Sequence, residues 1–342
     1  MNTLLISDTH FTDNSRDMYR WQLFSWLREA IPKNNVKYLF ICGDITEEKD
    51  RHSAKLVNKI VEELLSTYKQ TGLVSIYIIR GNHDGLNPTM PYFKFLGKYP
   101  CIRFIETPFA APFAEREVLM LPHTTTPADA WKNVEMERAD YIFMHATVKG
   151  AVSESGIQLD GIPPGLLATA RQAKIYSGDI HVPQKVKSGR VEVEYIGAPY
   201  PVRFGDKFEP RAVLIENFRT SRSLAIPSIQ RQTITITPKN AEMPLKALNS
   251  GDQVKVRIRL TPSEYGDWAR LKKWVIAACA EAKVELCGLE LEKVENKIKL
   301  RTPSVATTTK SAEQIVSEFC STNKLSSAVT TEGKKLLTEA ST

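Results

Sequence analysis

The 342-residue sequence contains no uninterrupted apolar run of about eighteen residues, and its N-terminal segment lacks the basic stretch and apolar core of a secretion signal. We therefore expect a soluble cytoplasmic protein that does not associate with a membrane. The cysteines are also few, odd in number and without a CxxC pair, which argues against both a disulfide framework and a thiolate zinc site. They are Cys42, Cys101, Cys279, Cys287 and Cys320.

Composition excludes a disordered chain, because 42% of the residues are hydrophobic and 25% are charged. The length favours one large domain and a smaller one. The net charge of +7 is concentrated in residues 222–342, where nineteen Lys and Arg face thirteen Asp and Glu. A polyanionic partner is compatible with this excess, although the excess does not by itself establish one.

Short apolar strands alternate with amphipathic helices over the first two hundred residues, which predicts an α/β domain. One helix is expected over 16–31 and ended by Pro32, and another follows Ser53 and ends at Gly72. The predicted strands are Thr3–Ile6, Tyr38–Ile41, Ser75–Ile79, Tyr141–Met144, Lys174–Ser177 and Val191–Ile196.

A shift to Ser, Thr, Pro and Asn after Phe218 indicates a domain boundary, so residues 1–218 form the first predicted domain. Residues 219–252 are interpreted as a linker and cap entry. Residues 253–301 are expected to form a β-α-β capping domain, in which apolar positions alternate along a strand over 254–260. Residues 302–342 are expected to be a helical segment, with helices over 311–320 and 331–340 after a polar stretch, 302–311.

Five short polar motifs each follow a predicted strand, where the loops of an α/β fold usually carry active-site residues. Four of the six histidines lie in these motifs. The motifs are Asp8-Thr9-His10, Gly43-Asp44, Gly81-Asn82-His83-Asp84, the lone His145, and Gly178-Asp179-Ile180-His181.

Asp, His and Asn side chains suit manganese, iron, zinc or magnesium. Two ions about 3.5–4 Å apart activate a water molecule and hold both the attacking and leaving oxygens of a phosphoester. The residue types therefore favour metal-dependent phosphoester hydrolysis.

The ordered motifs resemble the pattern of the calcineurin-like metallophosphoesterase superfamily: D-x-H, GD, GNHD or GNHE, a lone His, and GHxH. This resemblance implies an αββα sandwich of two sheets with a small α+β capping domain and two divalent ions, with Mn²⁺ as the expected metal and Mg²⁺, Fe²⁺ and Zn²⁺ as alternatives. It also implies that His83 protonates the leaving oxygen or stabilises the phosphoryl charge, with Asp84 setting the orientation and pKa of His83. The implied ligands are Asp8, His10 and His181 for one ion, Asn82, His145 and Asp179 for the other, and Asp44 as the bridge.

One position departs from the family pattern, since Asp179 stands where the family usually has His. A carboxylate there makes the second site harder and more anionic, which favours manganese or magnesium. An Asp179 that faces away would weaken the second ion and catalysis.

The segments GDIHVPQKV and VEYIGAPYPVRFGD are similar to the SbcD-type DNA-repair exonuclease branch of the superfamily. This resemblance implies a DNA exonuclease or endonuclease in repair, recombination or degradation, within a bacterial or phage-infected cell. It further implies an SbcC-type ATPase that binds the C-terminal segment, and it leaves a homodimer open. The alternatives are a phosphatase or phosphodiesterase for nucleotides or phosphoproteins, and a weakly catalytic subunit that binds DNA ends.

Three further features give weaker predictions. His52 precedes a helix N-terminus and is a phosphate-contacting candidate, although a capping or surface role fits it equally well. His123 is interpreted as a surface loop residue. The basic stripe of Lys255, Arg257 and Arg259 is a candidate contact for a nucleic-acid backbone, but alternating Glu290 and Glu292 favour cross-strand ion pairs and a solvated face.

Overall fold

A computed structural model describes the chain except for residues 88, 171, 189–190, 241–246, 295–310, 324 and 340–342. It contains two compact units, Met1–Val294 and Glu295–Thr342. The predicted boundary after Phe218 does not separate compact units. No helix in the described ranges is long and apolar enough to cross a membrane.

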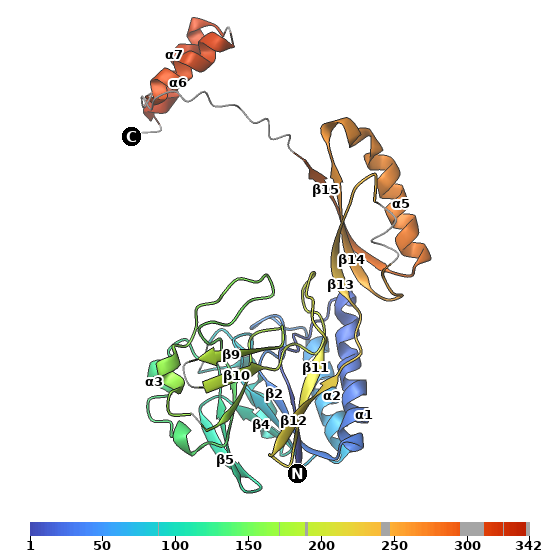
Figure 1. Cartoon of the computed structure of the whole chain (residues 1–342), viewed down its shortest axis with the longest axis vertical. Coiled ribbons are helices and arrows are strands. Elements are labelled where there is room, and N and C mark those ends of the chain that lie inside the picture. The colour runs from blue at the N-terminus through green and yellow to red at the C-terminus, as the bar shows by residue number, and fades with distance from the viewer. Residues whose placement is uncertain are drawn as a thin grey trace. The chain divides into compact units, whose positions relative to one another are not determined.

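The first six-stranded sheet is parallel from β1 through β4, which forms one edge, and antiparallel at the other edge, where β11 and β12 are added. Figure 1 labels its strands β2, β4, β11 and β12. Its strand order is β12 (Thr220–Ala225), β11 (Arg211–Glu216), β1 (Asn2–Ile6), β2 (Val36–Cys42), β3 (Ser75–Ile79) and β4 (Ile102–Ile105).

The second six-stranded sheet is also parallel in its centre and has an antiparallel strand at each edge. Its strand order is β5 (Phe109–Phe113), β6 (Arg116–Leu121), β7 (Tyr141–His145), β8 (Lys174–Gly178), β10 (Val191–Tyr195) and β9 (Gln184–Ser188).

The two sheets bury a shared core, because successive side chains of a strand point to opposite faces. Leu5 of β1 belongs to a cluster that also contains Phe40 of β2 and Phe143 of β7. Leu4 and Ile6, on the other face of β1, pack with the helices instead. This alternation confirms the predicted sandwich of two sheets.

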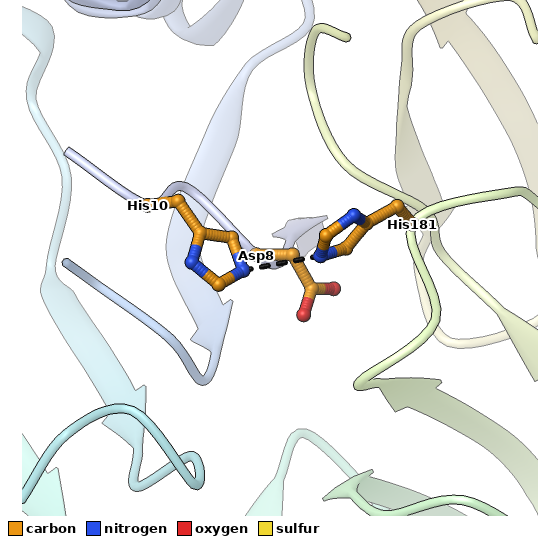
Figure 2. A group of neighbouring side chains, drawn as sticks. All are labelled: Asp8, His10 and His181. Carbon is orange, nitrogen blue, oxygen red and sulfur yellow. Dashed lines mark hydrogen bonds between the residues drawn. The ribbon is translucent and has the colours of Figure 1, made fainter. Parts of the chain in front are cut away.

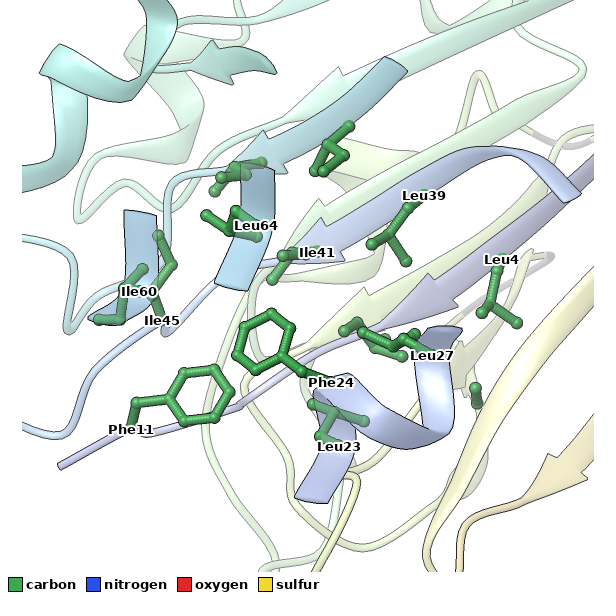
Figure 3. Close-up of a cluster of buried hydrophobic side chains, with 14 of the residues drawn as sticks. Leu4, Phe11, Leu23, Phe24, Leu27, Leu39, Ile41, Ile45, Ile60 and Leu64 are labelled. Atoms are coloured by element: carbon green, nitrogen blue, oxygen red, sulfur yellow. The ribbon is translucent and has the colours of Figure 1, made fainter. Parts of the chain in front are cut away.

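Two helices cover the outer face of the first sheet (Figure 3). α1 (Gln22–Lys33) contributes Phe24 and Leu27, and α2 (Ala54–Thr71) contributes Ile60 and Leu64. As predicted, Ser53 caps α2 and Gly72 ends it in a left-handed conformation.

The helix predicted over 16–31 differs from the observed one at both ends. Its first residues form the 3₁₀ helix η1 (Ser15–Trp21), and α1 continues through Pro32 to Lys33. Proline has no backbone N–H and so cannot donate a helical hydrogen bond. Because Pro32 lies next to the last residue of α1, only a bond of the final turn is lost. The other short helices of this unit are η2 (Tyr92–Lys98), α3 (Pro127–Ala130), η3 (Met136–Arg138), η4 (Pro164–Leu167) and η5 (Pro262–Asp267).

The cap is a three-stranded parallel sheet with its own buried cluster beneath α5 (Trp268–Glu281). Its strands are β13 (Arg231–Ile236), β14 (Gln253–Leu260) and β15 (Glu285–Lys293). The interpretation of 219–252 as a linker is wrong in part, because β12 extends the first sheet and β13 joins the cap. Thr233 and Thr235 alternate with the buried Ile234 and Ile236 along β13, and threonine and isoleucine are both strand formers.

The second compact unit contains α6 (Ala312–Thr322) and α7 (Ser327–Glu339), close to the predicted C-terminal helices. Ser311 and Gln314 form the capping box of α6. The predicted polar stretch 302–311 lies outside the described residues except for Ser311.

The contact between α2 and the first sheet gives a stability prediction. Replacing the fully buried Ile60 by Ala leaves a cavity beneath the helix, so Ile60→Ala is expected to cost roughly 2–5 kcal/mol of unfolding free energy. Guanidinium unfolding of the whole chain measures this loss. Glu62→Ala, an exposed change on the same helix, serves as the control, and equal effects of the two changes would contradict the packing assignment.

Candidate metal centre

The five polar motifs meet because they follow parallel strands of the two packed sheets. Asp8 follows β1, Asp44 follows β2, and Asn82 follows β3 of the first sheet. His145 ends β7, where it pairs in register with Gly178 at the end of β8. The carboxyl ends of parallel strands lie at one edge of a sheet, so the fold gathers these side chains.

The first group of metal-ligand atoms comes from Asp8, His10 and His181, all of which are buried (Figure 2). Nε2 of His10 and Nε2 of His181 lie 3.1 Å apart. Oδ2 of Asp8 is buried and has no hydrogen-bond partner among the described residues. Two imidazole nitrogens and an unpaired carboxylate oxygen facing one another fit a divalent cation.

The second group contains Asp8, Asp44 and His145, so Asp8 belongs to both groups. The two oxygens of Asp44 point in different directions. Oδ2 lies 3.6 Å from Nε2 of His10, and Oδ1 lies 3.4 Å from Nε2 of His145. The Asp44 carboxylate therefore belongs to the second group and also directs one oxygen toward His10 of the first.

Asn82 and Asp179 complete the surroundings of His145. The side-chain amide of Asn82 lies 2.9 Å from Nε2 of His145 and 3.0 Å from both oxygens of Asp44, which its NH₂ group satisfies as a hydrogen-bond donor. The same amide turned over would present its oxygen to a cation. Oδ1 of Asp179 lies 3.6 Å from the same His145 nitrogen, and its Oδ2 accepts a 2.5 Å hydrogen bond from Thr147. Asp179 thus faces the site.

Burial shapes the charge of these groups. It raises the pKa of Asp8 to about 7, and together with the Asp84 carboxylate it raises the pKa of Asp44 well above its ordinary value. It also lowers the pKa of His10 to about 4 and lowers that of His181. Neutral imidazoles keep a free lone pair, and a bound cation would favour the ionised carboxylates, so the electrostatics fit a metal centre.

Oxygen atoms of neighbouring residues lie behind the three ligand imidazoles, on the side of their Nδ1 atoms. Nδ1 of His145 lies 2.7 Å from the Cys42 carbonyl, Nδ1 of His10 lies 3.2 Å from Glu47, and Nδ1 of His181 lies 3.3 Å from Glu154. The contact with the Cys42 carbonyl holds a proton on Nδ1 of His145 and leaves its Nε2 for a metal, whereas Nδ1 of His10 and Nδ1 of His181 lie near a carboxylate without forming a hydrogen bond. Sequence reasoning missed Glu47 and Glu154, since neither belongs to a motif, although Glu47 follows the Gly43-Asp44 motif by three residues.

His83 lies beside the first group, with its ring centroid 5.0 Å from that of His10. Its Nδ1 lies 2.6 Å from the Glu47 carbonyl, which leaves Nε2 for a substrate oxygen. Asp84 does not have its expected role as the orienting partner of this ring. Its buried carboxylate instead accepts backbone hydrogen bonds from Gly81, Asp44 and Ile45, and so ties the second motif to the third.

The weaker candidates lie in different environments. Nε2 of His52 lies 2.8 Å from Oγ1 of Thr46, and the His52 ring packs on Tyr92, so this imidazole supports the loop after Asp44. The interpretation of His123 as a surface residue is wrong, because its half-buried ring lies 6.1 Å from that of His145.

The predicted ion pairs on the cap are present. Arg257 contacts Glu290 at 3.3 Å, and Arg259 contacts Glu292 at 2.9 Å. The third residue of the basic stripe, Lys255, places its ammonium 4.6 Å from the centre of the Phe204 ring.

The backbone is strained where it holds these ligands. Asp8, His10, Asp44 and Asp179 have φ values of 53°, 42°, 55° and 85°, in the left-handed region that residues other than glycine rarely adopt. Such conformations persist only when the surrounding structure enforces them. Gly43, at φ 92°, also lies so close to His145 that a Cβ atom would overlap the imidazole ring.

Gly43 and Gly72 allow a matched test of this close approach. Gly72 has φ 72° and open space around it, so alanine at either position is expected to cost about 1–2 kcal/mol in left-handed strain. Only Gly43→Ala displaces His145, and it should weaken Mn²⁺ binding roughly tenfold to a hundredfold, as loss of second-layer support does. Calorimetric titration of Mn²⁺ measures this, and equal affinities of the two variants would contradict the assigned contact.

Comparisons with known proteins agree with this geometry. Residues 1–183, more than half of the chain, match the family model for calcineurin-like phosphoesterase. The chain is similar to exonuclease subunit 1 of Enterobacteria phage T4, with 23% identity over 239 residues that cover 67% of this chain and 68% of the phage protein. A solved structure described as a novel archaeal phosphodiesterase aligns with 13% identity and a TM-score of 0.38, covering 66% of this chain and 99% of the archaeal one. The chain therefore belongs to the calcineurin-like phosphoesterase family, whose members bind two divalent metals, and it is a metal-dependent phosphoester hydrolase.

Proposed function

We propose that this protein is a two-metal-dependent DNA nuclease that acts as an exonuclease or endonuclease in DNA repair, recombination or degradation. The observation that carries the proposal is the Asp44 carboxylate, which directs one oxygen toward His10 and the other toward His145. The printed name of the phage relative, an exonuclease subunit, supports DNA as the substrate.

In this proposal Asp8, His10 and His181 hold one ion, Asn82, His145 and Asp179 hold the other, and Asp44 contacts both. When bound, the ions activate a water molecule and offset the negative charge of the phosphodiester. Four of the seven ligand side chains, Asp8, Asp44, Asp179 and Asn82, offer oxygen atoms, which favours Mn²⁺ over softer ions. Asp179 faces His145, and this supports a complete second ligand set over the weakly catalytic alternative.

His83 is proposed as the group that assists departure of the leaving oxygen. Its Nδ1 is held by the Glu47 carbonyl, and its half-buried position beside His10 places the ring at the rim of the first donor group. An imidazole fixed in this way delivers a proton from Nε2 when it is protonated.

The cap offers a candidate contact for DNA. Arg257 and Arg259 are about half exposed, and so are their glutamate partners. Exposed ion pairs of this kind contribute little stability, so a phosphate backbone competes for the two guanidinium groups at low cost. We therefore keep the stripe of Lys255, Arg257 and Arg259 as a proposed nucleic-acid contact.

The C-terminal helical unit is proposed to bind an SbcC-type ATPase. α6 and α7 leave large apolar side chains exposed, with Ile315 at 57% and Phe319 at 63%. Apolar side chains clustered on helices this short favour a protein partner, since such helices are marginal alone in water. The relative's name, a subunit, fits an assembly of more than one chain.

Digestion of end-labelled linear duplex and single-stranded DNA with Mn²⁺ tests the proposed activity. Wild-type protein should release labelled fragments, and His83→Ala should lower the rate roughly a hundredfold to ten-thousandfold, the usual share of a positioned acid. Glu62→Ala is the matched folded control, and a chelated reaction is the metal-free control.

Hydrolysis of bis(p-nitrophenyl) phosphate, measured in parallel, separates the outcomes. DNA left intact by an enzyme that hydrolyses this small diester would contradict autonomous DNA cleavage and favour a nucleotide substrate or a nuclease that needs its ATPase partner. An inert enzyme on both substrates, still able to bind DNA ends, would favour the binding-subunit alternative.

A further inference from the structure

The loop after β6 carries a histidine, His123, that belongs to neither group of metal-ligand atoms. His123 lies two residues beyond β6, which runs parallel to and beside β7, the strand that ends in His145. The rings of His123 and His145 lie 6.1 Å apart and nearly perpendicular, at 77°. His123 therefore lies beside His145 of the second group. His83, by contrast, lies beside His10 of the first group.

The position of His123 is fixed by its backbone. Its N–H donates to the Arg80 carbonyl at 2.8 Å, and its own carbonyl accepts a hydrogen bond from the Arg80 guanidinium. Arg80 is 5% exposed and directly precedes the Gly81-Asn82 motif. The loop that carries His123 is thus held at two points to the loop that carries Asn82.

The imidazole itself makes no hydrogen bond that would explain its place. Nδ1 of His123 is buried and has no partner among the described residues. Buried polar atoms are normally paired, and an exception beside an active site indicates a partner that arrives with the substrate or solvent. His123 does not join either group of ligand atoms lying within 4.8 Å of one another, so it stands outside the direct ligand shell.

The surroundings favour an anion as that partner. Burial lowers the pKa of His123 to about 4, the nearby His145, Arg80 and Lys49 also lower it, and Asp179 is the one acidic group among these neighbours. An ion held by Asp179 would offset the charge of that carboxylate. A phosphate oxygen on the second ion would then lie near the His123 imidazole, in surroundings where the other charged neighbours of His123, Arg80 and Lys49, are cations.

We infer that His123 is a phosphate-contacting residue on the second-ion side of the site, donating a hydrogen bond to a non-bridging oxygen of the bound phosphodiester. His83 and His123 then contact the substrate from the two ends of the ligand groups. This inference rests on the proposed metal site, but it does not depend on whether the substrate is DNA.

The test compares His123→Ala and His123→Gln with Thr125→Ala, an exposed change in the same loop, in full-length protein loaded with Mn²⁺. Calorimetry measures the number of Mn²⁺ ions bound and the affinity for inorganic phosphate, and bis(p-nitrophenyl) phosphate gives KM and kcat. His123→Ala should bind two Mn²⁺ with affinity within about threefold of wild type. It should weaken phosphate binding and raise KM by roughly tenfold to a hundredfold, the range for a hydrogen bond to a charged group. His123→Gln, which keeps a donor, should recover part of the loss, and Thr125→Ala should match wild type.

Three results would overturn the inference. Unchanged phosphate affinity and KM in both His123 variants would show that the imidazole does not contact the substrate. Loss of one bound Mn²⁺ in both variants would make His123 a metal ligand instead. A wild-type protein that binds no Mn²⁺ would overturn the metal site first, and the inference with it, whereas Mn²⁺-dependent diester hydrolysis without DNA cleavage would contradict only the proposed DNA substrate.

Discussion

The rest of the structure depends on a cluster of buried carboxylates and imidazoles at the carboxyl ends of parallel strands, which is only partly satisfied by hydrogen bonds. Asp8, Asp44 and His145 are nearly inaccessible to water, and burying such groups without partners is costly. The strained left-handed backbone at Asp8 and Asp44 adds to that cost. Two hydrophobic clusters hold the strands in place, one between the first sheet and its helices and one between the two sheets. Their burial offsets the free-energy cost of the site, which bound cations would reduce.

Polar contacts behind the ligands connect the metal site to the cap. The Arg20 guanidinium donates to the His10 carbonyl and lies 3.4 Å from Asp17, and Arg231 of β13 lies 3.4 Å from the same Asp17 oxygen. All three charged side chains are buried, and buried charges persist only when paired. The first strand of the third sheet, β13, therefore shares an ion-pair network with Arg20, whose guanidinium also holds the His10 carbonyl.

Much of the site could be predicted because strand-end position and residue type together restrict the chemistry. The motifs from Asp8 to His181 converge as expected, and the caps of α2 are visible in the sequence. Contacts that depend on tertiary distance could not be predicted. Glu154 reaches His181 from a loop without a motif, and a lone His123 carries no spacing signal. The role of Asp84 is set by three backbone N–H groups that no side-chain pattern reveals.

The central claim is that these buried side chains hold two metal ions and that both ions contact Asp44. Anomalous diffraction from crystals of the full-length protein grown with Mn²⁺ tests it most directly. The account predicts two peaks about 3.5–4 Å apart, the usual spacing of paired catalytic ions. One should contact His10 and His181, the other Asn82, His145 and Asp179, and the two should contact opposite oxygens of Asp44. A single peak at saturating Mn²⁺, or two peaks that do not share Asp44, would contradict the account.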